Sequence, residues 1–165
     1  MPTPEFVLRL REKIGHDLLP MSGVTGVVLD GGRVLLGRRT DTRRWAVPSG
    51  ILEPGEQPAL GVLREVEEET GVVAAVEALT STHVQPPVVY PNGDRAQYLD
   101  LCFRCRYVRG RAHVADDESL EVAWFDLAAL PELSANSAFK LELALSFTGT
   151  TWFEGLDDRT APRSR

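Results

Sequence analysis

The sequence predicts an α/β fold in which helices cover a mixed β-sheet. Residues 58–70 carry apolar side chains at helical spacing, and residues 97–107 alternate between apolar and polar side chains as a half-buried strand does. Predicted strands and helices also follow one another irregularly along the chain. We therefore expect an α/β sandwich built on a mixed sheet.

The composition fits one domain with its own core. Of the 165 residues, 43% are hydrophobic and 25% are charged, which are ordinary values for a globular protein. The net charge of −6 argues against a large nucleic-acid interface, which would need clustered Lys and Arg. The chain has neither a signal-peptide pattern nor an apolar run of the ~18 residues that cross a bilayer, so we expect a cytoplasmic protein without membrane contact.

The distribution of apolar and polar residues divides the chain into three parts. These are an N-terminal helix packed on the domain (1–20), the main domain (21–156) and a flexible polar tail (157–165). In the first part, Phe6, Leu10 and Ile14 recur at helical spacing. This spacing predicts an amphipathic helix over residues 5–16.

Several stretches predict strands. Residues 24–29 and 34–36 are apolar and flank Asp30-Gly31-Gly32, which favours a hairpin. Residues 72–82 predict a further strand. The turn-forming residues that follow predict a long loop over residues 83–95, of the kind that often determines specificity.

The last part of the main domain predicts a strand over residues 121–125 and then a turn capped by Asp126. Asn136 is expected to cap a final helix that runs to Phe147. Apolar residues occupy most sides of this helix, so it is either buried within the monomer or shared with a second subunit in a homodimer.

The two cysteines have the spacing of a redox or zinc half-site. Cys102 and Cys105 lie within the alternating strand, however, and an odd separation places them on opposite faces. We therefore expect reduced, packing cysteines. Trp45 is expected to anchor the core. His83 could bind substrate or take part in acid/base chemistry, but a single loop histidine more often does neither.

The helix predicted over residues 58–70 carries a group of acids on one side. Glu65, Glu68 and Glu69 share an arc next to the packing arc, which holds Ala59, Val62, Leu63 and Val66. Like charges at these spacings repel, and acids in the last turn oppose the helix dipole. A cation between the carboxylates would reverse both effects, and Mg²⁺ prefers such oxygen ligands.

Taken alone, the acidic run 67–69 would be interpreted as a solvated surface. The flanking residues favour a site instead. Arg64 lies beside the acids, Glu56 can reach Arg64 from the preceding loop, and Gly71 can end the helix in a left-handed conformation. Gly61 is small, which we interpret either as room beneath a metal ion or, equally, as a neutral substitution.

A longer pattern contains these residues. It begins at Gly50, reaches Glu56 after five residues, and after seven more enters the run Arg-Glu-Val-Glu-Glu-Glu-Thr-Gly-Val at residues 64–72. This pattern resembles the full signature of the Nudix hydrolase family, including its MutT-like and ADP-ribose pyrophosphatase-like members. Ser49 departs from the Gly that many members have before the signature.

The resemblance implies a Nudix-type α/β/α sandwich around a mixed sheet. It also implies Mg²⁺- or Mn²⁺-dependent hydrolysis of a diphosphate bond in a small nucleoside-diphosphate-linked compound. ADP-ribose, a nucleotide sugar or a nucleoside triphosphate would be such a substrate. Divalent cations neutralise the phosphate oxygens and lower the pKa of a bound water.

The resemblance also assigns roles to residues. Glu65, Glu68 and Glu69 would be metal ligands, while Glu56 would orient them by pairing with Arg64. Gly50 and Gly71 would form the turns of the motif.

The general base differs across the family, so several acids stay open for this role. The candidates are Glu68, Glu69, Glu118 and Glu121. For the last two acids, a solvated surface position is the competing interpretation.

Substrate contacts are expected from the basic cluster Arg38, Arg39, Arg43 and Arg44, with Arg38 and Arg44 as the candidates, for which a solvated loop is the equal alternative. Tyr90, Glu118 and Glu121 are the other candidates for substrate binding. In the family, a proline near Pro86 and Pro87 is associated with ADP-ribose, whereas a tyrosine near Tyr90 is associated with dinucleoside polyphosphates. A ligand-binding or regulatory module without turnover is the alternative function. Cleavage of capped RNA would need a basic channel.

Overall fold

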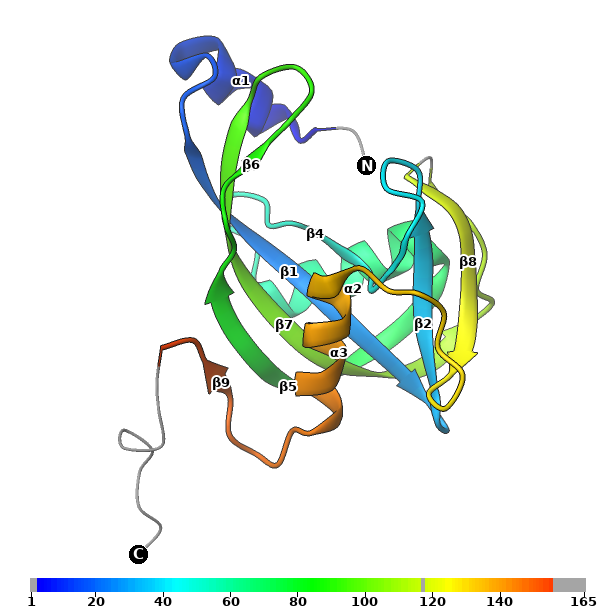
Figure 1. Cartoon of the computed structure of the whole chain (residues 1–165). Helices are drawn as coiled ribbons and strands as arrows, with labels where there is room; N and C mark the ends of the chain where they lie inside the picture. Colours follow the sequence, from blue (N-terminus) through cyan, green and yellow to red (C-terminus); the bar gives the residue numbers. More distant parts are fainter. Residues whose placement is uncertain (1–2, 117, 156–165) are drawn as a thin grey trace, which may run out of the picture.

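The computed structural model describes residues 3–116 and 118–155. These residues form a nine-stranded mixed sheet with the central order β3-β2-β1-β7-β5-β9, shown in Figure 1. The elements in chain order are α1 (Glu5–Ile14), β1 (Leu19–Asp30), β2 (Arg33–Arg39), β3 (Trp45–Ala46), β4 (Ser49–Ile51), α2 (Pro58–Thr70), β5 (Val72–Val84), β6 (Val88–Val89), β7 (Arg95–Gly110), β8 (Ser119–Asp126), α3 (Ala135–Leu145) and β9 (Trp152–Phe153).

Two helices cover opposite faces of the sheet, as Figure 1 shows for α2 and α3. On the α2 face, Val62 and Val66 pack with Val28 of β1 and Cys105 of β7. The core of the α3 face has a separate set of buried residues, which are Val27, Val34, Leu36, Val47, Cys102, Leu141 and Ala144. The two cores confirm the α/β/α sandwich that the sequence predicts.

Strand β1 branches, and the branch positions the site. It pairs with β2 only near the hairpin turn, and further back residues 23–25 pair with β4. Along its other edge β1 runs parallel to β7. A Cβ on Gly26 would overlap Val66, so the glycine lets α2 approach β1 closely. Strand β4 then leads into the loop before α2.

The helix predicted over residues 58–70 is confirmed. It ends at Gly71 with φ 68°, and the Gly71 N–H donates to the Glu67 carbonyl, which is the expected left-handed end. The packing arc is partly wrong, because Ala59 is exposed while Val62 and Val66 are buried. Ala59 lies in the first turn of α2.

The alternating strand is longer than predicted and is buried on both faces. Strand β7 lies between β1 and β5, and in its middle part α2 packs on one face and α3 on the other. Cys102 belongs to the α3-side core and Cys105 to the α2-side core, which confirms their opposite orientation. Both thiols are free.

The predicted loop over residues 83–95 is confirmed at residues 85–87 and 90–94 and wrong at its ends and at residues 88–89, which lie in strands. Strand β5 continues to Val84, and β6 pairs with the start of β7. His83 consequently lies in a strand, where its ring packs edge-on against Phe139 and Trp152, with ring centroids 5.7 and 6.3 Å away. The paired hairpin holds Tyr90 on an ordered turn.

The final helix starts two residues earlier than predicted. Ser134 is its cap, since the side chain accepts a hydrogen bond from the backbone N–H of Ser137. Asn136 is therefore inside the helix rather than at its cap, and the helix ends at Leu145 instead of Phe147. The predicted strand before it is confirmed as β8, and Asp126 accepts a hydrogen bond from the Ala128 N–H in the following turn.

Helix α1 is shorter than predicted and contributes one buried side chain, Val7. Leu10 is 41% exposed. Arg11 ties the helix to the rest of the domain by donating to the carbonyls of Asp17 and Arg95 at 2.6 and 2.7 Å. The predicted tail, residues 157–165, lies outside the described residues. In the described part of the chain, no helix has the length and apolarity to cross a membrane.

Candidate active site

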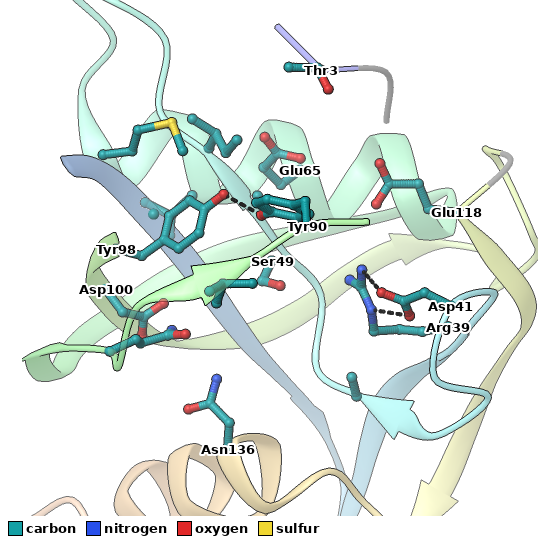
Figure 2. Close-up of a pocket in the computed structure, with 18 of the residues that line it drawn as sticks. Thr3, Arg39, Asp41, Ser49, Glu65, Tyr90, Tyr98, Asp100, Glu118 and Asn136 are labelled. Atoms are coloured by element: carbon teal, nitrogen blue, oxygen red, sulfur yellow. Dashed lines mark hydrogen bonds and ion pairs between the residues drawn. The ribbon is translucent and has the colours of Figure 1, made fainter. Parts of the chain in front are cut away.

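A cavity of about 800 Å³ opens beside α2, and Figure 2 shows the side chains around it. Its wall comes from the N-terminal segment, β1, the β2–β4 region, the turn before β7 and α3. Pockets of this size bind nucleotide-sized ligands. Of the signature residues, Gly50, Ile51 and Glu65 face this cavity together with residues far from them in sequence, whereas Glu69 lines a small second pocket that shares Arg39 and Glu118 with the cavity.

The pair predicted within the signature is present. Arg64 donates to both carboxylate oxygens of Glu56, at 2.8 and 2.9 Å, and also to the Ile51 carbonyl. The hydrogen bonds from Arg64 lower the pKa of Glu56. Because Glu56 precedes α2 and Arg64 lies in its second turn, the pair fixes the loop against the helix.

Glu65 is almost fully buried, at 1% exposure. A Cβ on Gly50 would overlap the Glu65 carboxyl group, so Gly50 makes room for it. Glu65 Oε1 lies 2.9 Å from Arg64 Nη1, but neither oxygen accepts a hydrogen bond from a described residue. Burial raises the pKa of Glu65 to about 7, although Arg64 opposes the shift.

Glu69 is one turn further along α2 and is 8% exposed. Burial, followed by the nearby charges of Glu65 and Asp116, raises the pKa of Glu69 to about 8. Arg39 and a hydrogen bond from the Ser49 backbone oppose this shift. Glu65 and Glu69, on one side of α2, therefore both keep their protons to a higher pH than an ordinary glutamate does.

Glu68 lies apart from these two acids. It is exposed and accepts a hydrogen bond from Arg64 at 3.0 Å. Within residues 3–116 and 118–155, no three acid, histidine or cysteine side chains already converge on a point that would hold a metal ion. The structure therefore brings Glu65 and Glu69 together. Glu68 would have to rotate its exposed side chain to reach a cation bound by these two acids.

The donors nevertheless fit a divalent cation. Hard cations bind carboxylate oxygens, and a cation would satisfy the two Glu65 oxygens and offset the repulsion between Glu65 and Glu69. The small size of Gly61 has another explanation than the predicted one. A Cβ there would overlap Leu52 and crowd Glu56, so Gly61 serves the Glu56 loop and not a metal ion.

The arginines that line the cavity, Arg11 and Arg39, are not the two candidates. Arg38 and Arg44 do not line the cavity; they make long ion pairs with Glu121 at 3.9 Å and Glu132 at 3.7 Å. Arg39 does line it.

Arg39 is held in place by Asp41, which accepts two hydrogen bonds from it at 2.9 Å. Sequence reasoning placed Arg39 in the cluster without selecting it. The alternation of β2 is the signal that could have done so, because Arg39 shares the Leu35 face, on which α2 packs.

Two other candidates line the cavity. Tyr90 shares a hydrogen bond of 2.6 Å with Tyr98, and Figure 2 shows the two rings side by side. Glu118 also faces the cavity, whereas Glu121 does not line it. Gly71 packs beneath the His113 ring, where a Cβ would overlap the imidazole.

One group was missed by sequence reasoning altogether. Asp100 and Lys140 form a buried ion pair of 2.9 Å that lines the cavity. They are 40 residues apart, and no local pattern connects a strand aspartate with a helix lysine at that distance.

Known proteins are similar to this chain. Residues 19–144 match the family model described as NUDIX domain. A MutT-like protein of Streptomyces ambofaciens is 41% identical over 102 residues, which are 61% of this chain and 60% of the relative. An ADP-ribose pyrophosphatase of Methanocaldococcus jannaschii is 29% identical over 120 residues, which are 71% of this chain and 68% of the relative. The crystal structure of a UDP-X diphosphatase superposes with a TM-score of 0.62 at 26% identity and covers 86% of this chain and 68% of that one.

Proposed function

The chain belongs to the Nudix family, and from this premise we propose that it hydrolyses a diphosphate bond in a small nucleoside-diphosphate-linked compound with the help of Mg²⁺ or Mn²⁺. The observation that carries the proposal is the pair of buried acids on α2. Glu65 and Glu69 have raised pKa values, and the Glu65 oxygens accept no hydrogen bond from the described part of the chain. Buried acids of this kind are typical of functional sites.

The residues of the chain would divide the work as follows. Glu65 and Glu69, joined by Glu68, would hold the cation, while the pair of Glu56 and Arg64 keeps α2 in register with the preceding loop. When bound, the cation would neutralise phosphate oxygens and lower the pKa of a water molecule.

Further contacts with the diphosphate would come from the cavity wall. Arg39, fixed by Asp41, would donate to phosphate oxygens, since a planar guanidinium binds such groups well. Glu118 is the later acid that faces the cavity, so it is retained as a candidate general base and Glu121 is not.

The relatives support a small substrate. One is named an ADP-ribose pyrophosphatase and another a UDP-X diphosphatase, and the cavity of about 800 Å³ suits a molecule of that size. We therefore propose ADP-ribose or a nucleotide sugar ahead of a nucleoside triphosphate. A cytoplasmic location, a homodimer and the division into N-terminal helix and main domain stay predictions.

The test is a hydrolysis assay over a panel of nucleoside diphosphate derivatives, with and without Mg²⁺, in which the two phosphomonoester products of each compound are separated and quantified. We expect Mg²⁺-dependent hydrolysis of at least one compound, and a loss of about 10²-fold or more in kcat/KM for Glu69→Gln. Glu67→Gln is the matched control, because Glu67 is an exposed acid on the same helix. Equal activity in Glu69→Gln and Glu67→Gln would refute the metal role. No hydrolysis of any compound by the unmodified chain would favour the binding-module alternative.

A further inference from the structure

A second buried carboxylate lies on the sheet face that α3 covers. Asp100 is 2% exposed, and its Oδ1 accepts hydrogen bonds from Lys140 Nζ at 2.9 Å and from Thr25 Oγ1 at 2.8 Å. Lys140 Nζ also donates to Thr25 Oγ1 at 2.8 Å. We call these three residues the Asp100 cluster. In the view of Figure 2, Asp100 lies on the other side of Ser49 from Glu65, so the cluster is separate from the acids of α2.

The second oxygen of Asp100 has no such partners. Oδ2 is buried and accepts no hydrogen bond from residues 3–116 or 118–155. Asp100 and Lys140 both line the cavity. Burial removes a carboxylate oxygen from water, so an acceptor of this kind normally finds a donor. The group that best satisfies Oδ2 is therefore a hydrogen-bond donor presented from the cavity.

A structural role alone would not favour this arrangement. A buried ion pair loses the hydration of both charges, and apolar residues of similar volume often stabilise a core as well or better. The neighbouring buried positions on the same face, Val27 and Cys102, are apolar or thiol side chains. A charged pair at the cavity wall points to recognition of a ligand.

We propose that Asp100 is a specificity-determining residue that accepts an N–H from the nucleobase of the substrate, and that this base is adenine or cytosine, which carry an exocyclic amino group where hypoxanthine and uracil carry an oxo group. This inference rests on the proposed function, because a nucleotide-derived substrate brings a base into the cavity. Apolar wall residues such as Met21, Val24 and Val47 can contact the flat ring. An oxo group facing Oδ2 would place two acceptors together, so amino bases are preferred.

Lys140 and Thr25 are positioning residues in this scheme. Both donate to Oδ1, which fixes the carboxylate and leaves Oδ2 as the acceptor for the ligand. Their effect on the substrate is exerted through Asp100.

The test measures equilibrium binding of nucleoside monophosphates by calorimetry with the full chain. AMP and IMP differ in having an amino or an oxo group on the same ring carbon, and CMP and UMP form a second such pair. We expect the amino member of the more tightly bound pair to bind at least about 10-fold more tightly than its oxo counterpart. Equal affinities within both pairs, or no binding of any of the four, would overturn the inference without any variant.

Asp100→Asn sharpens this test. Lys140 and Thr25 are both donors, so the amide oxygen must face them and the amide NH₂ must take the Oδ2 position. The acceptor becomes a donor, and the preference for amino over oxo bases should vanish or reverse. Thr80→Val is the matched control, because Thr80 is buried and donates to the Cys102 carbonyl but does not line the cavity. An unchanged AMP to IMP ratio in Asp100→Asn would refute the role of Asp100.

The two proposals can fail separately. Hydrolysis with equal affinities within both nucleotide pairs would refute the Asp100 inference and leave the proposed function intact. A preference for amino bases without hydrolysis of any compound would refute the proposed function and show that the cavity binds nucleotides.

Discussion

The two buried carboxylate sites, Asp100 on β7 and the pair Glu65 and Glu69 on α2, differ in how their charge is balanced. Asp100 and Glu65 line the same cavity. Asp100 has Lys140 at 2.9 Å and Thr25 as a second donor. Glu65 and Glu69 are also buried, both pKa values are raised by that burial, and the charge of Glu65 adds to the shift of Glu69. Arg64 touches Glu65 but directs its hydrogen bonds to Glu56, Glu68 and a backbone carbonyl.

The difference shows which of the two sites has its balancing cation within the protein. The Asp100 site carries its own cation on α3, so its geometry is set once the chain has folded. In the α2 site, Glu65 and Glu69 can ionise only at a cost because no cation of the protein balances both of them, and their pKa values are raised accordingly. We take that imbalance as the mark of the place where an external cation binds.

Removing the internal cation should have the largest effect. Lys140→Met leaves the Asp100 carboxylate buried without its ion-pair partner, so we expect the free energy of unfolding to fall by about 3–5 kcal/mol. The measurement is urea unfolding near neutral pH. The double variant Asp100→Asn/Lys140→Met leaves no charge and should lose less than Lys140→Met. A double variant that loses as much would show that lost packing, rather than charge, causes the effect.

Crowding the α2 site should have the next largest effect, and on activity. A Cβ on Gly50 would overlap the Glu65 carboxyl group, so Gly50→Ala must displace that side chain. Misplacing a reacting group by about 1 Å can cost about 10²-fold in rate, or about 2.7 kcal/mol of barrier. Kinetics on the best substrate of the panel measure this, with the melting temperature as control. Unchanged kcat/KM would show that the position of Glu65 is unimportant.

The smallest expected effect is the pH dependence of stability without metal. The pKa of Glu69 is about 8 in the folded protein and 4.5 as its ordinary value, so between these values the unfolded chain has released a proton that the folded chain keeps. The free energy of unfolding therefore falls as pH rises through this window. We expect a loss on the order of 2 kcal/mol, given 1.36 kcal/mol per pKa unit and the coupling to Glu65.

The matched variant for this measurement is Glu69→Gln, which cannot ionise at that position. Its stability should fall less between about pH 5 and pH 8 in chelator-treated samples. A decline parallel to that of the unmodified chain would show that other groups cause the pH dependence.

Local patterns predicted much of the α2 region. The helix limits, the left-handed Gly71 and the pair of Glu56 with Arg64 were all predicted, because each depends on neighbours close in sequence. The opposite faces of Cys102 and Cys105 also follow from strand alternation. These features need only the period of a helix or a strand.

Where the prediction failed, the missing information was long-range pairing. The loop expected over residues 83–95 is a strand end and a hairpin, because β5 and β6 pair with β7. The cap of α3 is Ser134 and not Asn136, although both residue types are suited to that position. Propensity alone does not decide between two such residues.

The sequence by itself determined the features of the α2 region: the Nudix signature, the acidic side of the helix and the ion pair between Glu56 and Arg64. The tertiary structure alone decided which groups meet across the cavity. The parallel register of β1 with β7 brings Thr25 beside Asp100, the packing of α3 adds Lys140, and Gly50 admits Glu65 to a buried place. The physical reason is that side-chain period fixes only near neighbours, whereas burial and charge balance depend on contacts between distant segments.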